Sequence, residues 1–194
     1  MTDDGIGRLL VASLHQSIGD VLPQRLEYYE HWLSPMGLKE GRSGLAPLNA
    51  VLSFLRQEGQ APYDQVMATA GRYSAEWHFQ DAGAAPWLRV LPRPLRRRAA
   101  LRRSRALLVA AFASHRVKTS VRKATGTVTI TGSVFCGVRD RWPWPTCAYL
   151  ASSVTRLLEL QGLSAEVRVA SCRAQGEAAC TLTVNFEPAT PEAA

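Results

Sequence analysis

The spacing of the apolar residues changes near residue 115, and this change limits the possible folds more than any other feature of the chain. Before it, apolar side chains recur every three or four positions, which is typical of amphipathic helices. After it, Val117, Thr119 and Val121 alternate with polar residues, which predicts a β-hairpin that turns at 124–126. The chain therefore combines a helical first half with a sheet.

The remaining elements follow from the same periodicities and from turn residues. Helices are expected over residues 6–33, with a break near Pro23, and over 45–58, 64–79, about 95–115 and 146–161. A second hairpin is expected from strands over 166–172 and 180–186. The order of N-terminal helices, hairpin, helix and hairpin predicts an α+β fold in which an antiparallel sheet packs against helices on one face.

Composition and length narrow the class further. The 194 residues suit one compact domain, and 46% hydrophobic with 20% charged residues excludes a disordered chain. The longest apolar run, 106–113, is too short to span a bilayer. Asp3 and Asp4 stand where a secretory signal needs positive charge, so we expect a cytoplasmic protein.

Positive charge is concentrated in one block. No acidic residue occurs from Ala82 to Arg139, a stretch with 13 basic residues, whereas the rest of the chain has 10 basic and 16 acidic residues and is mildly acidic. Such a field attracts anions, but it leaves three interpretations open: a solvated Arg-rich helix start, a nucleic-acid-binding surface, or the rim of a ligand pocket or membrane surface. Nucleic acid is the weakest of these, because no base-reading motif accompanies the charge.

A loop of tryptophans and arginines follows the first hairpin. Arg139 and Arg141 flank Asp140 and precede Trp142 and Trp144. Rigid aromatic rings next to guanidinium groups suit a flat, partly anionic ligand through stacking and cation–π contact. The alternative is a packed loop that closes one end of the core.

Cys172 and Cys180 lie symmetrically about Gly176. A three-residue turn at Gly176 would place the two thiols opposite one another, where they could form a disulfide or bind a metal. Pairing Val167 with Val184 gathers the apolar residues on one face but sends the two thiols to opposite faces, unless a bulge near Gly176 intervenes. A disulfide, a metal pair and two small buried thiols therefore all stay open.

The other two cysteines carry a weaker signal. Cys136 and Cys147 are eleven positions apart and lack the short C-x-x-C spacing of structural zinc sites, so no metal ligand is assigned beyond the alternative at Cys172 and Cys180. Cys147 lies on the inner stripe of its helix, either as a small core residue or as a thiol facing a cavity. No histidine pair and no familiar catalytic motif occurs, so we assign no catalytic residue.

The C-terminal half resembles the 4-vinyl reductase domain, a family named after bacteriochlorophyll 4-vinyl reductase and related to small subunits of the TRAPP vesicle-tethering complex. The similarity extends over residues 43–187, with a helical extension at 1–42 and a loose tail at 188–194. The residues that carry it are Phe135-Cys136, Pro145-Thr146-Cys147-Ala148-Tyr149, Glu166-Val167-Arg168, Cys172-x3-Gly176-Glu177-x2-Cys180 and, upstream, 43–50, 70–72 and 91–95.

The resemblance implies an α+β domain that often dimerises and encloses an apolar cavity for a small hydrophobic molecule, in some members a tetrapyrrole or its precursor. The chain departs from the family at Leu150-Ala151-Ser152, where members often carry glycine. The larger side chains would narrow such a cavity or change what fits it. A reductase label alone does not imply redox chemistry, because no nicotinamide or flavin motif is present.

These observations predict a homodimeric carrier or sensor of a hydrophobic, partly anionic molecule, tetrapyrrole-like or lipid-like. No cofactor is required beyond that ligand, and peripheral membrane contact or a protein partner is compatible with the sequence. The alternatives are a TRAPP-like interaction scaffold and a tetrapyrrole-modifying enzyme. The expected ligand-binding residues are Cys147, Tyr149, Trp142 and Trp144 in the cavity wall, with Arg139 and Arg141 for an anionic group.

Overall fold

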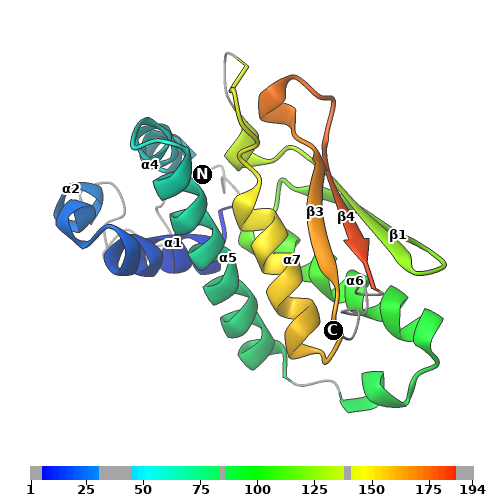
Figure 1. The fold of residues 1–194 in the computed structure, drawn as a ribbon. Helices are drawn as coiled ribbons and strands as arrows, with labels where there is room; N and C mark the ends of the chain where they lie inside the picture. The colour runs from blue at the N-terminus through cyan, green and yellow to red at the C-terminus, as the bar shows by residue number, and fades with distance from the viewer. Residues whose placement is uncertain (1–5, 31–44, 84–85, 138–140, 187–194) are drawn as a thin grey trace, which may run out of the picture.

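In the computed structural model, helices pack on one face of a four-stranded antiparallel sheet, which confirms the predicted α+β class (Figure 1). The structure describes residues 6–30, 45–83, 86–137 and 141–186. The helices are α1 (Arg8–Val21), η1 (Pro23–Arg25), α2 (Leu26–Glu30), α4 (Leu45–Gln57), α5 (Gln60–Ala82), η2 (Pro86–Val90), α6 (Arg93–Ala111), η3 (Val134–Cys136), α7 (Ala148–Leu160) and η4 (Arg173–Gln175). The strands are β1 (Arg116–Arg122), β2 (Thr125–Thr131), β3 (Glu166–Ser171) and β4 (Cys180–Asn185).

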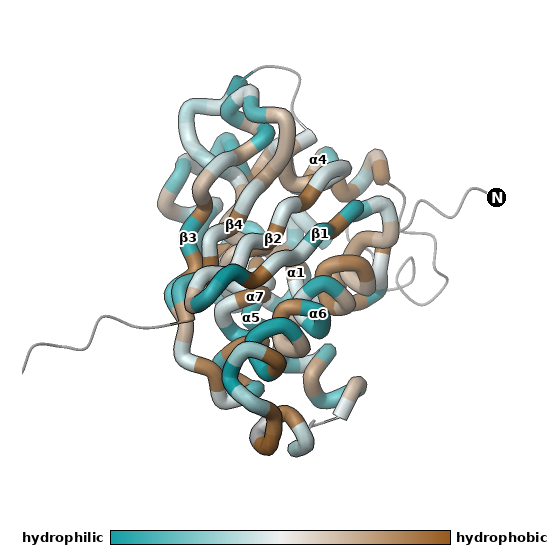
Figure 2. Tube along the Cα trace, turned by 90° about the vertical axis from the view of Figure 1, so that its right-hand side faces the viewer, coloured by the Kyte–Doolittle hydropathy of each residue, from teal (hydrophilic) through white to brown (hydrophobic). Residues whose placement is uncertain are grey.

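The sheet has the strand order β1-β2-β4-β3, and Figure 2 shows these strands side by side, from β3 on the left to β1 on the right. The two hairpins therefore meet through β2 and β4, where Val128 lies opposite Leu182. Along β2 and β4, apolar residues such as Val128 and Leu182 alternate with polar ones, and these apolar side chains are fully buried against the helices. The opposite face of the two central strands carries threonines, including Thr127 paired with Thr183, and these are partly exposed.

Close helix packing connects the N-terminal helices to the sheet. Helix α5 lies between α1 and α7, and α7 lies between α5 and the sheet (Figure 1). Gly71 lets α5 approach α7, because a Cβ at that position would lie 2.5 Å from the carbonyl oxygen of Tyr149. Leu14 and Ile18 of α1 are fully buried in the same core as the sheet residues. Helix α1 is thus part of one continuous core.

Some observed boundaries of helices and turns differ from the expected ones, and two of the helix boundaries lie beside prolines. The first helix ends at Val21, before Pro23 starts the short η1 turn. Helix α5 begins at Gln60, four residues earlier than expected, because Pro62 falls in its first turn, where no backbone N–H is needed. The first hairpin turns at Lys123 and Ala124, with Lys123 at φ 51°, and not at 124–126. The expected loose tail lies outside the described residues, as does the whole expected connection at 34–44.

None of the described helices has the length and apolar character needed to cross a membrane.

Candidate metal centre

Four cysteine sulfurs lie within 4.8 Å of one another in the interior of the protein. Cys147 Sγ is 3.2 Å from Cys172 Sγ and 3.4 Å from Cys136 Sγ. Cys136 Sγ is in turn 3.6 Å from Cys172 Sγ and 3.3 Å from Cys180 Sγ. All four residues are at most 2% exposed. We call Cys136, Cys147, Cys172 and Cys180 the thiol cluster.

Three separate parts of the chain supply these thiols, and they meet at one end of the sheet, at the top of Figure 1. Cys136 is the last residue of η3, and Cys147 is the N-cap of α7. Cys172 follows β3 and Cys180 begins β4, so both belong to the second hairpin. The cluster therefore links the start of α7 to η3 and to the second hairpin.

The second hairpin resolves the conflict between register and thiol position. Val167 pairs with Val184 and Val169 with Leu182, as the apolar alternation predicts. The pairing then shifts, because Ser171 lies opposite Thr181. This irregularity lies in β3 and not at Gly176, which instead provides the left-handed turn at φ 97°. The extra residue turns Cys172 to the same side as Cys180.

Hydrogen-bond donors surround the sulfurs. The backbone N–H of Thr146 points at Cys172 Sγ over 3.4 Å, and that of Arg173 points at Cys180 Sγ over 3.5 Å. The hydroxyl of Thr146 lies 3.3 Å from Cys136 Sγ. Donors of this kind stabilise thiolate over thiol and are typical of the outer shell of a metal-thiolate site.

The thiols also influence one another. Hydrogen bonds from the thiols of Cys136 and Cys147 lower the pKa of Cys172. The contact with Cys136, followed by that with Cys172, raises the pKa of Cys147. Several negative charges at these distances repel one another, so without a cation the cluster resists the loss of more than one proton.

The distances fit a shared ion better than disulfides. A disulfide requires an S–S bond of about 2.05 Å and joins only two sulfurs. Four sulfurs placed tetrahedrally about 2.3 Å from one zinc ion lie about 3.8 Å apart. The measured separations of 3.2 to 3.6 Å and the outer limit of 4.8 Å bracket that value. The thiol cluster therefore has the donor set and spacing of a four-cysteine metal site.

A buried arginine stabilises the chain beside the cluster. Arg56 is 7% exposed, and its Nη2 donates a hydrogen bond of 2.8 Å to the carbonyl oxygen of Phe135. The hydroxyl of Tyr63 donates to the carbonyl oxygen of Thr146 over 3.2 Å. Burial raises the pKa of Tyr63, so its hydroxyl stays protonated as a donor. These bonds fix the residues that precede Cys136 and Cys147, and the charge of Arg56 offsets negative charge nearby.

The expected ligand-binding loop lies next to the second hairpin. Trp142 donates its backbone N–H to the carbonyl oxygen of Ala174 over 2.7 Å, and its ring meets that of Trp144 edge to face at 5.3 Å. Both indole N–H groups are buried without a hydrogen-bond partner among the described residues. The side chain of Arg141 lies over Gly176. Arg139 falls outside the described residues.

Tyr149 and Cys147 are committed to other contacts. The Tyr149 hydroxyl is 2.7 Å from Ser74 Oγ, which donates to Ser13 Oγ over 2.8 Å. This buried chain connects α7, α5 and α1. Cys147 contributes its sulfur to the thiol cluster. The structure therefore does not bring these two residues together with the tryptophan loop in one described hollow, and their assignment to a ligand cavity stays a prediction.

An aromatic hollow lies elsewhere, between α2 and α4. Its volume is about 450 Å³, and Tyr28 meets both Tyr29 and Phe54 edge to face at 5.3 and 5.4 Å. Arg25 and Glu58 form an ion pair of 3.2 Å at the same site. Burial, followed by the charge of Glu58, raises the pKa of Tyr29 to about 12. The residues that line the hollow are Arg25, Tyr28, Tyr29, Phe54, Gln57 and Glu58.

Neither the four-thiol cluster nor this hollow is predicted by the sequence. Signals for the cluster were present, because all four cysteines lie in the last 59 positions and two of them flank a hairpin turn. The hollow left no comparable signal, since Tyr28 and Phe54 are ordinary residues of separate amphipathic helices.

Comparison with protein-family models gives no match to this chain, and comparison with curated proteins gives no match either.

Proposed function

We propose that the protein binds one zinc ion through Cys136, Cys147, Cys172 and Cys180. The observation that carries this proposal is the convergence of four buried sulfurs at separations close to those of a tetrahedral site. A closed set of four thiolates leaves no open position for substrate, so the ion has a structural role. Zinc is preferred because it favours tetrahedral thiolate sites and undergoes no redox change.

The ion would fasten α7 to η3 and to the second hairpin and would explain why polar donors converge on this part of the core. Zinc with four thiolates carries a net charge of about −2, which is costly to bury without compensation. The N–H groups of Thr146 and Arg173 and the guanidinium of Arg56 supply positive potential on the chain around it. The N-terminus of α7, at Cys147, adds the favourable end of a helix dipole.

Cobalt substitution tests this site directly. Protein refolded with one equivalent of Co2+ should develop the intense near-ultraviolet sulfur-to-cobalt bands and the visible bands of tetrahedral coordination, and zinc should bleach them. Cys172→Ser should shift and weaken both sets of bands. A weak octahedral spectrum in the wild-type protein would reject a four-thiolate site. A single tetrahedral iron shares this ligand set, and a red colour in the protein as isolated would identify it.

We further propose that this metal-stabilised domain holds a small hydrophobic, partly anionic molecule as a carrier or sensor, as in the 4-vinyl reductase-like proteins that it resembles. The aromatic hollow between α2 and α4 supports this function. Its volume falls in the range of small-molecule sites, and three aromatic rings suit a flat compound. Because Arg25 is paired with Glu58 in the same hollow, an anionic group of the ligand would have to compete with Glu58 for Arg25. The loop of Arg141, Trp142 and Trp144, with its two unpartnered indole N–H groups, is the second predicted location.

An anionic aromatic dye, 8-anilinonaphthalene-1-sulfonate, is a suitable probe for both locations. Tyr28→Ala should weaken dye binding about tenfold by removing one wall of the hollow. Tyr73→Ala is the matched control, since Tyr73 stacks on Trp77 away from the hollow. A loss of binding in Trp144→Leu, with Tyr28→Ala unchanged, would move the ligand to the tryptophan loop. No difference in any variant would reject both locations.

The remaining alternatives predict different behaviour. A TRAPP-like scaffold predicts a stable complex with a protein partner and no bound small molecule. A tetrapyrrole-modifying enzyme predicts turnover of a vinyl-bearing pigment when a reductant is supplied. No contact among the described residues favours either one. Native mass spectrometry and the absorption spectrum of the purified protein distinguish them from the carrier or sensor.

A further inference from the structure

Six of the seven arginines of α6, those that follow Arg93, fall into two groups. Arg96, Arg97 and Arg103 bond to backbone carbonyl groups: Arg96 to Gly162 at 2.7 Å, Arg97 to Lys123 at 3.1 Å and Arg103 to Gly83 at 2.9 Å. These three contacts fasten α6 to the end of α7, to the turn of the first hairpin and to the end of α5. This part of the basic block therefore has a structural role.

The second group faces solvent. Arg98, Arg102 and Arg105 are exposed, and none has a side-chain hydrogen bond or ion pair among the described residues. Because an α-helix turns about 100° per residue, these three side chains lie within about 80° of Leu95 and form one stripe with it. Hydrophilic residues accordingly cover much of α6 in Figure 2.

Exposed apolar side chains lie at the N-terminal end of that stripe. Trp87 is 52% exposed, Val90 83% and Leu95 47%. They are three of the five large hydrophobic residues found exposed in the described parts of the chain. All three belong to η2 and the first turn of α6, the green segment at the lower right of Figure 1. Apolar side chains gathered beside a basic stripe mark an interaction surface.

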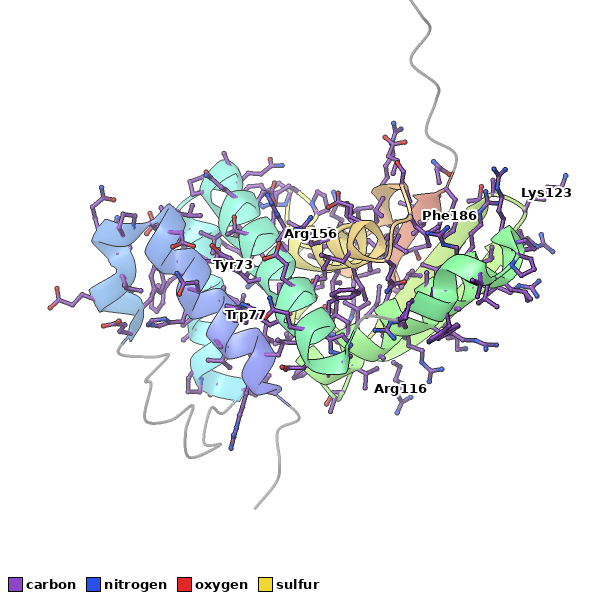
Figure 3. All side chains as sticks on the ribbon, turned by 90° about the horizontal axis from the view of Figure 1, so that it is seen from below. Tyr73, Trp77, Arg116, Lys123, Arg156 and Phe186 are labelled. Atoms are coloured by element: carbon purple, nitrogen blue, oxygen red, sulfur yellow. The ribbon has the colours of Figure 1, made fainter. Side chains whose placement is uncertain are left out.

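A small hollow extends this surface to the edge strand β1. It has a volume of about 250 Å³, lies between α6 and β1, is lined by Arg98, Arg102 and Ser120 among others, and has the donors to hold a phosphate group. Lys118 and Arg122 are exposed on the same strand, but they pair with Thr129 and Thr125 and so belong to the sheet face away from α6. Figure 3 shows Arg116 and Lys123 pointing outward at the two ends of β1. The surface thus combines an apolar end, an arginine stripe and a small basic hollow.

We propose that this surface binds the face of an anionic lipid bilayer. Trp87, Val90 and Leu95 would enter the interfacial region, where tryptophan is favoured, while Arg98, Arg102 and Arg105 contact lipid phosphates. Neither kind of contact is strong alone, but apolar insertion and a polybasic stripe together give stable binding.

The apolar end of the surface argues for a bilayer over other occupants. Aliphatic residues such as Val90 and Leu95 gain little from a nucleic acid, which binds mainly through phosphate contacts and aromatic stacking. A second copy of the chain would bring arginine stripes of like charge together, which opposes association. A bilayer with acidic headgroups is complementary to both the apolar and the basic part.

Vesicle co-sedimentation tests the proposal on the whole protein. Vesicles of phosphatidylcholine alone are compared with vesicles that contain about 30% phosphatidylserine. We expect binding to the second kind only, with weakening as salt increases. No binding to the anionic vesicles overturns the proposal.

Variants separate the apolar from the electrostatic contribution. Val90→Asn removes an apolar side chain without changing the charge and should reduce vesicle affinity about tenfold, and Arg98→Gln with Arg102→Gln should reduce it about 20-fold or more. The matched controls are Leu45→Asn, on the exposed face of α4, and Arg8→Gln with Arg72→Gln, which removes the same charge elsewhere. Both controls should bind like the wild-type protein. Equal losses of vesicle affinity in the controls would mean that the location of these residues is irrelevant and would overturn the proposal that this surface binds the bilayer.

A nucleic-acid surface gives a different pattern. In that case single-stranded RNA would displace the protein from vesicles, and the arginine pair would lower RNA and vesicle binding alike, with the uncharged variant Val90→Asn unchanged in both. That result overturns the bilayer proposal, whereas a vesicle-specific loss in Val90→Asn supports it. Thermal unfolding of each variant confirms that the fold is retained.

Discussion

The sulfur atoms of Cys147 and Cys172 lie 3.2 Å apart, although 25 positions separate the two residues in the chain. Their contact joins the N-terminus of α7 to the second hairpin. Cys136 and Cys180 complete the same cluster, so three distant parts of the chain depend on it. If a metal ion holds these sulfurs, it contributes directly to folding, because an unfolded chain cannot assemble the site.

Removing one ligand should therefore destabilise the whole domain. Cys172→Ser is expected to lose zinc and to lower the free energy of unfolding by about 4 kcal/mol at a metal concentration near a thousand times the dissociation constant. Urea unfolding with metal analysis measures both effects. The control is Val154→Ala, a fully buried change in α7 that should cost about 2 kcal/mol and keep the metal. Full metal retention by Cys172→Ser would contradict the assignment.

Two helical glycines should respond oppositely to alanine. At Gly71 a Cβ would lie 2.5 Å from the carbonyl oxygen of Tyr149 and 3.0 Å from the backbone nitrogen of Ser153, so α5 and α7 must separate. Gly71→Ala should cost about 2 kcal/mol. At Gly19 the nearest atom would be a side-chain carbon of Leu26 at 3.6 Å, and Gly19→Ala should gain about 0.5 to 1 kcal/mol. Chemical denaturation of both variants tests the close approach, and equal effects would refute it.

The hydroxyl chain between three helices should show energetic coupling. Tyr149→Phe removes the partner of Ser74 Oγ at 2.7 Å and should cost about 1 to 2 kcal/mol. Ser74→Ala should cost a similar amount. Because both variants break the same contact, the double variant should be less destabilised than the sum by about 1 kcal/mol. Additive costs in this cycle would show that the two hydroxyls act independently.

His115 should make stability depend on pH. Burial lowers its pKa from 6.5 to about 4, and its Nδ1 lies 3.0 Å from the carbonyl oxygen of Leu108. The folded protein resists protonation that the unfolded chain accepts, so stability is complete above pH 6.5 and falls as pH drops toward 4.

Between pH 6.5 and 4 the free energy of unfolding should decrease by about 1 kcal/mol per pH unit, and by about 3 kcal/mol in all. His115→Phe cannot titrate and should lose this part of the pH dependence. Urea midpoints at pH 7.5 and 5.5 measure the difference between the two proteins. An identical pH dependence in the variant would mean that His115 stays uncharged in the unfolded chain as well, or that it titrates normally in the fold.

Much of the fold could be predicted from the sequence because apolar periodicity is a local signal. The pairing of Val167 with Val184 follows from alternation alone and is confirmed by the structure. The first helix ends just before Pro23, as predicted, because proline has no backbone N–H to continue the helical hydrogen bonds. The exact turn of the first hairpin was missed, because Lys123 adopts a left-handed conformation that glycine usually provides.

The thiol cluster depends on information that spacing alone does not carry. The shift in β3 between Val169 and Ser171 decides which face Cys172 occupies, and nothing in the local sequence reveals it. Cys136 and Cys147 meet because η3 and the start of α7 both lie against the second hairpin. Such long-range convergence becomes visible only when the sheet is assembled. The predicted tryptophan loop lies next to the hairpin, but its role in ligand binding stays a prediction.

The mass of the natively folded protein, purified without added metal, tests the central claim most directly. Native mass spectrometry should find one zinc ion per chain, and denaturation should release it and expose four thiols that react with a thiol reagent. The native protein should be unreactive toward the same reagent. A native mass equal to that of the chain alone, with its thiols free, would contradict the four-cysteine zinc site.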